Sequence, residues 1–291
     1  ALMKTLIEGL EIDYQAYEPA VMYINGEYWG IQNIREKINE HFIASNHDVD
    51  IDDIDLIENN GEAKHGGTEA YNEFMNALQN ANMQSQADYE EVAEQVELES
   101  YIDYMVAQTF FSNTDWPGNN LRYWRERKNG AQWRWIIYDT DFGFSMYGQN
   151  YEQNMLQFAT DPNGPGWPNP SWSTYMFRKF LENDSFQHEF INRYADLLNY
   201  SFSAPIINSV IDSLSEQIEN EMAAHQQRWG GSIDNWNNNV QVLREFADRR
   251  EGFVESHITS FFGVGERNIV RVNVSGDEQG VVRVNRLQPS S

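Results

Sequence analysis

One segment, residues 112–144, restricts the fold more than any other part of this 291-residue chain. Its first half cannot lie inside a helix, because turn-forming residues crowd into eight positions: Asn113, Asp115, Pro117, Gly118, Asn119 and Asn120. Its second half alternates, and one parity is shared by Trp133, Trp135, Ile137, Asp139 and Asp141. In an extended strand these side chains point to one face. The segment therefore predicts a loop and then an aromatic strand that ends in two carboxylates, with a turn at Gly143.

Carboxylate and amide oxygens gather in this segment. Asp139 and Asp141 end the predicted strand, and Asp115 and Asn120 lie in the preceding loop. Hard divalent cations such as Mg²⁺ prefer oxygen ligands of this kind and commonly lie between protein and phosphate. A second interpretation stays open, in which the loop forms Asx turns and the aspartates cap the next element.

The spacing of these residues adds to the metal hypothesis. Asp115 and Asn120 stand five positions apart, as do the catalytic-loop Asp and the Mg-binding Asn of protein kinases. Residues 141–143 read Asp-Phe-Gly, the motif that carries a second metal ligand downstream in a kinase. Neither match is specific alone, but their order and placement together favour phosphoryl transfer.

Three blocks of the sequence resemble the CotH kinase-like family, named after a spore-coat protein. They are residues 25–30 with 36–38 behind them, residues 113–120, and residues 133–144. The resemblance extends more loosely from residue 1 to about Gly263. It implies an α+β, atypical protein-kinase-like fold, with a small N-terminal β-hairpin part and a large, mostly helical C-terminal lobe. It also implies transfer of a phosphoryl group from ATP to Ser or Thr of a partner protein.

The hypothesis assigns a role to each oxygen-bearing residue. Asp139 and Asp141 would hold Mg²⁺ or Mn²⁺ across the nucleotide phosphates, and Asn120 would complete the ligand set. Asp115 would accept or orient the proton of the attacking hydroxyl, so that catalysis rests on positioning and charge neutralisation. Whether Asp139 or Asp141 is the main ligand stays open, and Ca²⁺ is an alternative metal.

Candidate nucleotide contacts lie outside this segment. The resemblance places the hairpin around Asn25 beside the nucleotide, with Glu36 at its end. Glu36 and Lys37 either contact the nucleotide or form a solvated pair. Arg122, with Arg125 and Arg134, either neutralises phosphate charge or extends along the surface.

The start of the chain lacks two kinase features. Residues 1–10 resemble the end of a helix, because leucines recur every four positions, so we expect the N-terminal part of the domain to be truncated. No Gly-rich phosphate loop and no Val-Ala-Ile-Lys-like strand occurs in the sequence. Both would precede residue 1 or be built differently.

Asn25-Gly26 between two apolar runs predicts a hairpin over residues 20–34.

The charge balance restricts the partners. There are 45 Asp and Glu against 20 Lys and Arg. A field of that sign repels nucleic acid and anionic membranes and favours divalent cations or basic partners; solubility alone is the other explanation. For the protein substrate that the resemblance implies, we expect a basic or Ser/Thr-rich protein. The sequence contains no apolar run of about 18 residues and therefore predicts no membrane span. It has no Cys, which excludes disulfides and thiolate metal sites.

The rest of the chain is mainly helical. Residues 48–55 lack the Gly and Glu of a calcium loop and predict an acidic edge strand or loop. Residues 59–67, bracketed by glycines, could form a lid, and residues 147–172 form a long polar loop where kinases meet their substrate. Helices are predicted over 69–81, 89–98, 103–111, 174–181, 186–200, 205–225 and 240–262.

Composition changes near Gly263, which predicts a domain over residues 1–263 and a β-hairpin tail over 264–291, possible start of a β-rich module. Such modular architecture favours an extracellular or cell-surface location.

Two other functions stay open. One is a glycoside hydrolase with Asp115 and Asp139 as acid and base and tryptophans lining a sugar cleft. The other is a non-catalytic kinase-like surface or scaffold module.

Overall fold

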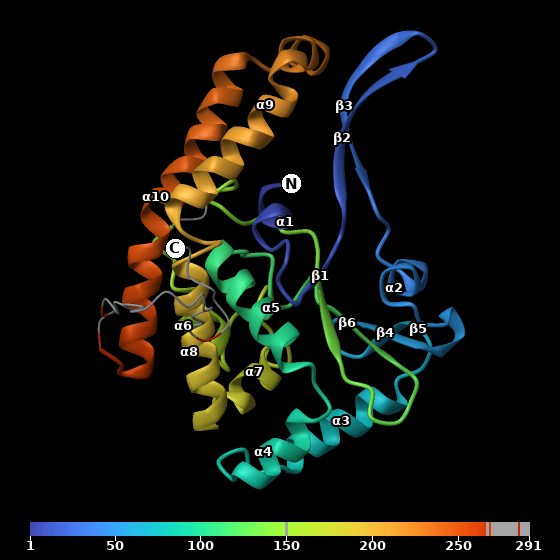
Figure 1. Ribbon diagram of the computed structural model, residues 1–291, viewed down its shortest axis with the longest axis vertical. Coiled ribbons are helices and arrows are strands. Elements are labelled where there is room, and N and C mark those ends of the chain that lie inside the picture. The colour runs from blue at the N-terminus through green and yellow to red at the C-terminus, as the bar shows by residue number, and fades with distance from the viewer. Residues whose placement is uncertain (149–150, 266–267, 269–284, 286–291) are drawn as a thin grey trace, which may run out of the picture.

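The computed structural model describes residues 1–148, 151–265, 268 and 285, and Figure 1 shows their arrangement. It confirms the α+β class, with a small N-terminal β part and a larger helical C-terminal region. The helices are α1 (Leu2–Leu6), α2 (Glu40–His47), η1 (Ile51–Asp53), α3 (Glu69–Asn80), α4 (Gln86–Ala93), α5 (Leu98–Phe111), α6 (Met155–Thr160), α7 (Tyr175–Phe180), α8 (Asp184–Leu198), α9 (Ala204–Trp229) and α10 (Ile233–Phe262). The strands are β1 (Asp13–Tyr14), β2 (Tyr17–Ile24), β3 (Glu27–Arg35), β4 (Ile54–Glu58), β5 (Glu62–His65), β6 (Arg122–Glu126) and β7 (Arg134–Ile137).

A five-stranded sheet has the order β1-β7-β6-β4-β5. β1 runs parallel to β7, and the other neighbours are antiparallel. Side chains alternate between its two faces. Ile57 and Trp135 enter the main hydrophobic core, whereas Leu56 and Ile136 enter a smaller core that also holds Phe42 of α2. Both faces are therefore covered at β4 and β7, and these two strands carry buried apolar residues at both parities.

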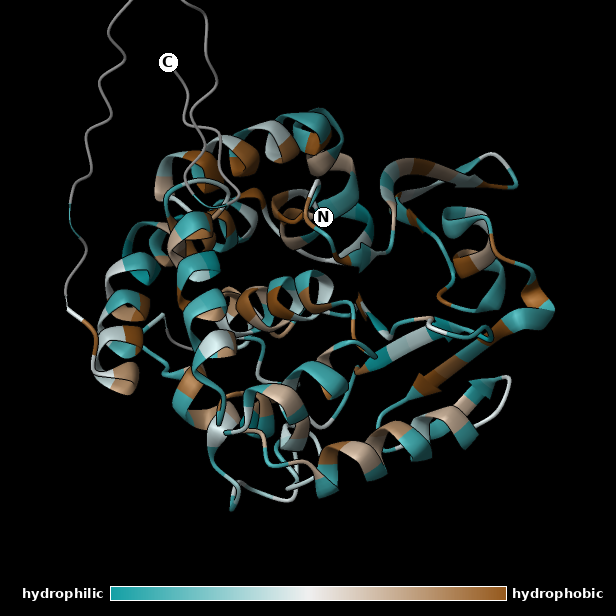
Figure 2. Ribbon diagram, turned by 60° about the horizontal axis from the view of Figure 1, so that its bottom comes forward, coloured by the Kyte–Doolittle hydropathy of each residue, from teal (hydrophilic) through white to brown (hydrophobic). Residues whose placement is uncertain are grey.

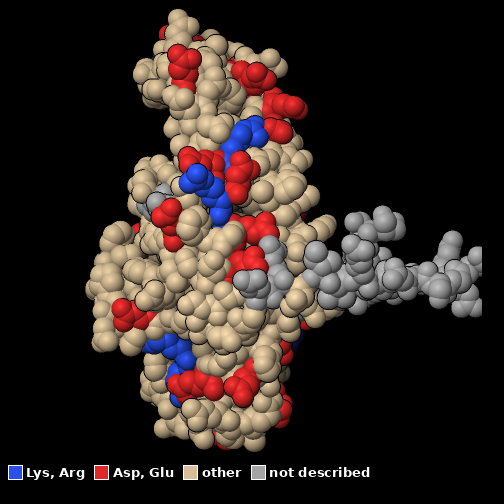
Figure 3. All heavy atoms as spheres, turned by 90° about the vertical axis from the view of Figure 1, so that its left-hand side faces the viewer, with Lys and Arg blue, Asp and Glu red and all other residues tan. Residues whose placement is uncertain are grey.

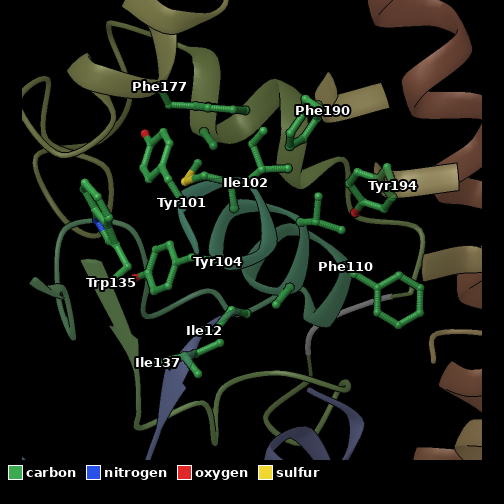
Figure 4. Packing of buried hydrophobic residues seen from close by; sticks show 14 of the residues in the cluster. Ile12, Tyr101, Ile102, Tyr104, Phe110, Trp135, Ile137, Phe177, Phe190 and Tyr194 are labelled. Carbon is green, nitrogen blue, oxygen red and sulfur yellow. The ribbon is translucent and has the colours of Figure 1, made fainter. Parts of the chain in front are cut away.

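Helix α5 forms the centre of the main core. Every residue from Ser100 to Phe111 is buried, and apolar side chains from the sheet and from α7 and α8 surround the helix in Figure 4. Hydrophobic residues concentrate on this helix and on the inner strands in Figure 2, while the outer helix faces are hydrophilic. The predicted apolar helix over residues 103–111 is confirmed, and it begins earlier, at Leu98.

Long helices complete the C-terminal region. α9 and α10 pack against each other (Figure 1). α10 begins at Ile233, several residues before its predicted start, because the Ser232 side chain accepts a hydrogen bond from Asn235 N and caps it. No helix in the described part of the chain is both long and apolar enough to cross a bilayer. The predicted tail hairpin over residues 264–291 lies almost wholly outside the described residues.

The predicted hairpin around Asn25-Gly26 is confirmed. β2 and β3 form a separate two-stranded arm, and positive φ angles of 52° at Asn25 and 84° at Gly26 close its turn. The C-terminal end of α9 contacts β3 of the arm (Figure 1). Ile31 N donates to His225 Nδ1 at 3.0 Å, and Trp229 Nε1 donates to the Trp29 carbonyl at 3.0 Å.

The structure corrects the predictions for residues 48–67. Asp48 is a left-handed helix cap, residues 51–53 form η1, and β4 then lies inside the sheet between β6 and β5. The loop alternative therefore holds for residues 48–53, and only residues 54 and 55 of the predicted range enter a strand, which is an inner strand and not an edge. The suspected lid is instead an ordered strand, because β5 pairs with β4 at the sheet edge. The long loop over residues 147–172 contains the short helix α6.

Candidate functional site

The loop after α5 positions Asp115 and Asn120. α5 ends at Phe111, and its C-cap Ser112, with a φ of 55°, turns the chain out of the helix. The buried Trp116 then anchors the loop in the core. Gly118 N donates to the Pro168 carbonyl at 2.6 Å. A Cβ at Gly118 would lie 2.4 Å from Pro170 Cδ, so only glycine allows this approach. The loop is thus fixed at both its ends before β6 begins.

The second segment reaches the site differently from the prediction. β7 ends at Ile137, and Asp139 has a φ of 48°, so the predicted strand does not extend to Asp141. The residues that follow turn onto the end of α5. Gly143 lies so close that a Cβ there would be 2.9 Å from the Phe111 carbonyl, and Phe144 N donates to that same carbonyl at 2.9 Å. Turn geometry, rather than strand parity, places the two aspartates.

The four predicted metal and catalytic residues come together. Asn120 Nδ2 donates to Asp115 Oδ2 at 2.7 Å and to the Asp139 carbonyl at 3.4 Å. Asn119 Nδ2 donates to the same Asp115 oxygen at 2.9 Å. Asp115 and Asn120 are buried, while Asp139 and Asp141 are exposed. The site is therefore a buried acid–amide pair beneath two carboxylates that face solvent.

Electrostatics within this group favour a cation. Burial raises the pKa of the Asp139 carboxyl, the charge and the hydrogen bond of Asp141 raise it further, and the charge of Asp115 adds to this. Arg35 acts in the opposite direction and lowers that pKa. Like charges held this close favour either a shared proton or a bound cation. The atoms that this group can offer to a metal are all oxygens, which fits Mg²⁺. Within the described residues, however, no group of three or more His, Cys, Asp or Glu side chains is arranged to hold a metal by itself.

A pocket of about 110 Å³ adjoins the exposed carboxylates. It lies between α1, the β1–β2 connection, the end of β3 and the residues after β7. Its walls contain Ala1, Met3, Lys4, Ile7, Tyr14, Gln15, Tyr17, Arg35, Ile137, Tyr138, Asp139, Thr140 and Asp141. Asp139 and Asp141 thus open onto a cavity that also contains cationic side chains, whereas Asp115 and Asn120 are not among its walls.

The three predicted nucleotide contacts are not gathered at this pocket. Glu36 binds the β1–β2 connection instead: its Oε2 accepts from Ala16 N at 2.9 Å, and its carbonyl accepts from Gln15 Nε2. Lys37 is exposed. Arg122 donates to Glu58 Oε1 through Nη2 at 2.6 Å and stacks 4.8 Å from the ring of Tyr138. Their proposed role in nucleotide binding stays a prediction.

Arg125 and Arg134, the other two arginines considered, also have protein partners. Arg134 Nη2 donates to Asp13 Oδ1 at 3.1 Å. Arg125 Nη2 donates to the Lys128 carbonyl at 3.0 Å, and its guanidinium lies over Trp133. Neither lines the pocket. These contacts agree with the interpretation that both side chains extend along the sheet surface.

Sequence reasoning missed two residues. Arg35 lines the pocket, and its position directly before Glu36 at the end of the hairpin could have identified it. Arg250 of α10 is buried and donates to Thr109, Phe110 and Gln153 carbonyls. No local pattern marks Arg250, because its partners are about 100 to 140 residues away in the sequence.

Comparison with known proteins agrees with this geometry. A family model described as CotH kinase protein matches residues 1–254 of the chain. No curated protein matches it. The family match covers most of the chain, including the arm, the loop after α5 and the residues after β7. The protein therefore belongs to the CotH kinase family.

Proposed function

We propose that this protein transfers the γ-phosphoryl group of ATP to a Ser or Thr hydroxyl of a partner protein. Membership of the CotH kinase family supports a kinase-like function. The observation that carries the proposal is the convergence of Asp115, Asn120, Asp139 and Asp141 from two separate segments. A bound Mg²⁺ or Mn²⁺ would be held by Asp139, Asp141 and the free oxygen of Asn120, and would neutralise phosphate charge.

Asp115 is suited to receive the hydroxyl proton. Two amides donate to its Oδ2, from Asn119 at 2.9 Å and from Asn120 at 2.7 Å. These bonds fix the carboxylate, and Oδ1 accepts no hydrogen bond from another described residue, so we assign it to the substrate. The substrate oxygen would form a bond to the γ-phosphorus as the bond to the leaving ADP breaks, and the hydroxyl proton would pass to Asp115.

The surface charge supports a basic acceptor protein. The chain has a net charge of −25, and acidic side chains prevail over basic ones on the face shown in Figure 3. Such a surface attracts positively charged partners at a rate that falls as salt is added. We therefore propose an acceptor in which Ser or Thr is surrounded by Lys or Arg.

Labelled ATP provides the direct test. The wild-type chain, with Mg²⁺ or Mn²⁺, should transfer phosphate to a basic Ser/Thr-rich protein. Asp115→Asn and Asp141→Asn should each reduce the rate by at least about 100-fold. Asp53→Asn is the matched control, because Asp53 is an exposed aspartate of η1. Transfer that persists in the Asp115→Asn, Asp141→Asn double variant would refute the proposal.

A further inference from the structure

The pocket beside Asp139 and Asp141 needs cations if it is to hold a nucleotide. Asp139 and Asp141 carry negative charge on one wall, and phosphates bring more. A metal offsets part of this repulsion, but phosphoryl-transfer sites also use Lys or Arg side chains against the phosphates. A Lys or Arg side chain that lines the pocket and has no other partner would supply that contact.

Two cationic side chains, Lys4 and Arg35, line the pocket. Lys4 is already engaged: its Nζ lies 3.2 Å from Glu8 Oε2 and 5.4 Å from the centre of the Tyr14 ring. Arg35 is exposed, and its side chain makes no hydrogen bond or ion pair within the described part of the chain. Its charge is nevertheless close enough to act on Asp139. Arg35 is therefore the pocket cation available to a ligand.

The backbone at Arg35 is held on two sides. It pairs with Tyr17, another pocket residue, in the register of the arm. The next residue, Glu36, accepts a hydrogen bond from Ala16 N at 2.9 Å. Farther along the arm, Ile31 N donates to His225 Nδ1 of α9 at 3.0 Å. The backbone that carries Arg35 is thus held in place, so ligand binding has to order only the side chain.

We propose that Arg35, delivered by the β2–β3 arm, is the phosphate-binding cation of the nucleotide site. A planar guanidinium can donate to two phosphate oxygens at once, and Arg35 lines the same pocket as Asp139 and Asp141. This assignment rests on the proposed function. It moves the contact from Lys37 and Arg122, which the sequence suggested, to a residue that lines the pocket.

Calorimetric titration with Mg-ADP tests the assignment without requiring turnover. Arg35→Ala should raise the Kd for Mg-ADP by about tenfold or more, and Arg35→Lys should recover only part of the loss, because an ammonium cannot donate in a bidentate fork. Lys128→Ala is the charge control, since Lys128 is on the β6–β7 turn with a side chain 63% exposed. Its Kd should match that of the wild type.

The outcomes separate two failures. If the wild-type chain binds Mg-ADP and Arg35→Ala binds it within twofold as tightly, the Arg35 assignment is overturned while the proposed function stands. A tenfold loss in Lys37→Ala, with none in Arg35→Ala, would overturn it in favour of Lys37. If the wild-type chain binds no Mg-ADP at all, the proposed function fails and this assignment with it.

Discussion

Arg250 offers the sharpest test of how the site is supported. Its side chain is 1% exposed. It donates to the carbonyls of Thr109 at 2.7 Å and Phe110 at 2.9 Å, which belong to the last turn of α5 and lack partners within the helix. It also donates to Tyr151 and Gln153 carbonyls at 2.6 and 2.7 Å. One guanidinium thereby joins the end of α5 to the segment that follows the Asp-Phe-Gly turn.

The expected cost of Arg250→Met follows from these bonds. Two buried carbonyls, those of Thr109 and Phe110, would lose their partner at about 1–3 kcal/mol each, while the bonds to Tyr151 and Gln153 are only partly buried and count for less. Burial lowers the pKa of Arg250 to about 10, so the bonds do not fully offset the desolvation of the charge. We therefore expect a net loss near the lower end, about 2–3 kcal/mol of unfolding free energy.

Urea denaturation of the whole chain measures this loss, because the midpoint falls while the slope is unchanged if only stability is affected. Arg249→Met is the matched control. Arg249 is the neighbouring arginine, with a side chain 55% exposed, and it contacts the Tyr151 hydroxyl and ring. Its loss should cost less than about 1 kcal/mol. Equal losses in the two variants would refute the argument that the buried carbonyls depend on Arg250.

Three further predictions test other parts of the structure. Burial, with the charge of Arg250, lowers the pKa of His257 to about 4, whereas the pKa of an unfolded histidine is about 6.5. The unfolding free energy should therefore be highest above pH 6.5 and fall as the pH drops toward 4. In urea titrations His257→Gln should remove this pH dependence. Asp103→Asn should lower the unfolding free energy by about 3–5 kcal/mol, since it removes the carboxylate that pairs with the buried Arg193 guanidinium. Thermal unfolding should show a smaller loss of stability in the Asp103→Leu, Arg193→Met double variant. Gly30→Ala should detach the arm from α9, because Gly30 has a φ of 105° and a Cβ there would lie 2.8 Å from His225 Nδ1 and from Trp229 Nε1; limited proteolysis should then cut the arm faster than in the wild type, and an unchanged rate would contradict the contact.

Local rules explain most of what could be predicted from the sequence. The arm follows from Asn25-Gly26, two residues that tolerate the positive φ of a tight hairpin turn. The helices follow from apolar periodicity, and their starts shift where a cap such as Ser232 lies earlier than the periodic residues. These features depend on neighbours close in the sequence.

Contacts between distant segments could not be predicted in the same way. Arg122 sits near the predicted loop in the sequence, yet its guanidinium pairs with Glu58 across the sheet. Arg250 has no local signature, because the carbonyls it binds belong to α5 and to residues 151–153. Lys37 and Arg35 lie two positions apart, and only the course of the chain beyond β3 separates the one that lines the pocket from the one that does not.

The sequence predicted that Asp115, Asn120, Asp139 and Asp141 come together, with a strand carrying the last two. That strand, β7, ends at Ile137 and does not reach them. The end of α5 accounts for their convergence instead. The loop with Asp115 leaves directly from that end, and the turn with Asp141 is tied back to it by the 2.9 Å hydrogen bond from Phe144 N to the Phe111 carbonyl. One helix terminus therefore anchors both carboxylate-bearing segments, and Arg250 binds the two carbonyls just before Phe111. It follows that changes at the C-terminal turn of α5 should disturb metal and nucleotide binding more than equally destabilising changes at the sheet edge formed by β5.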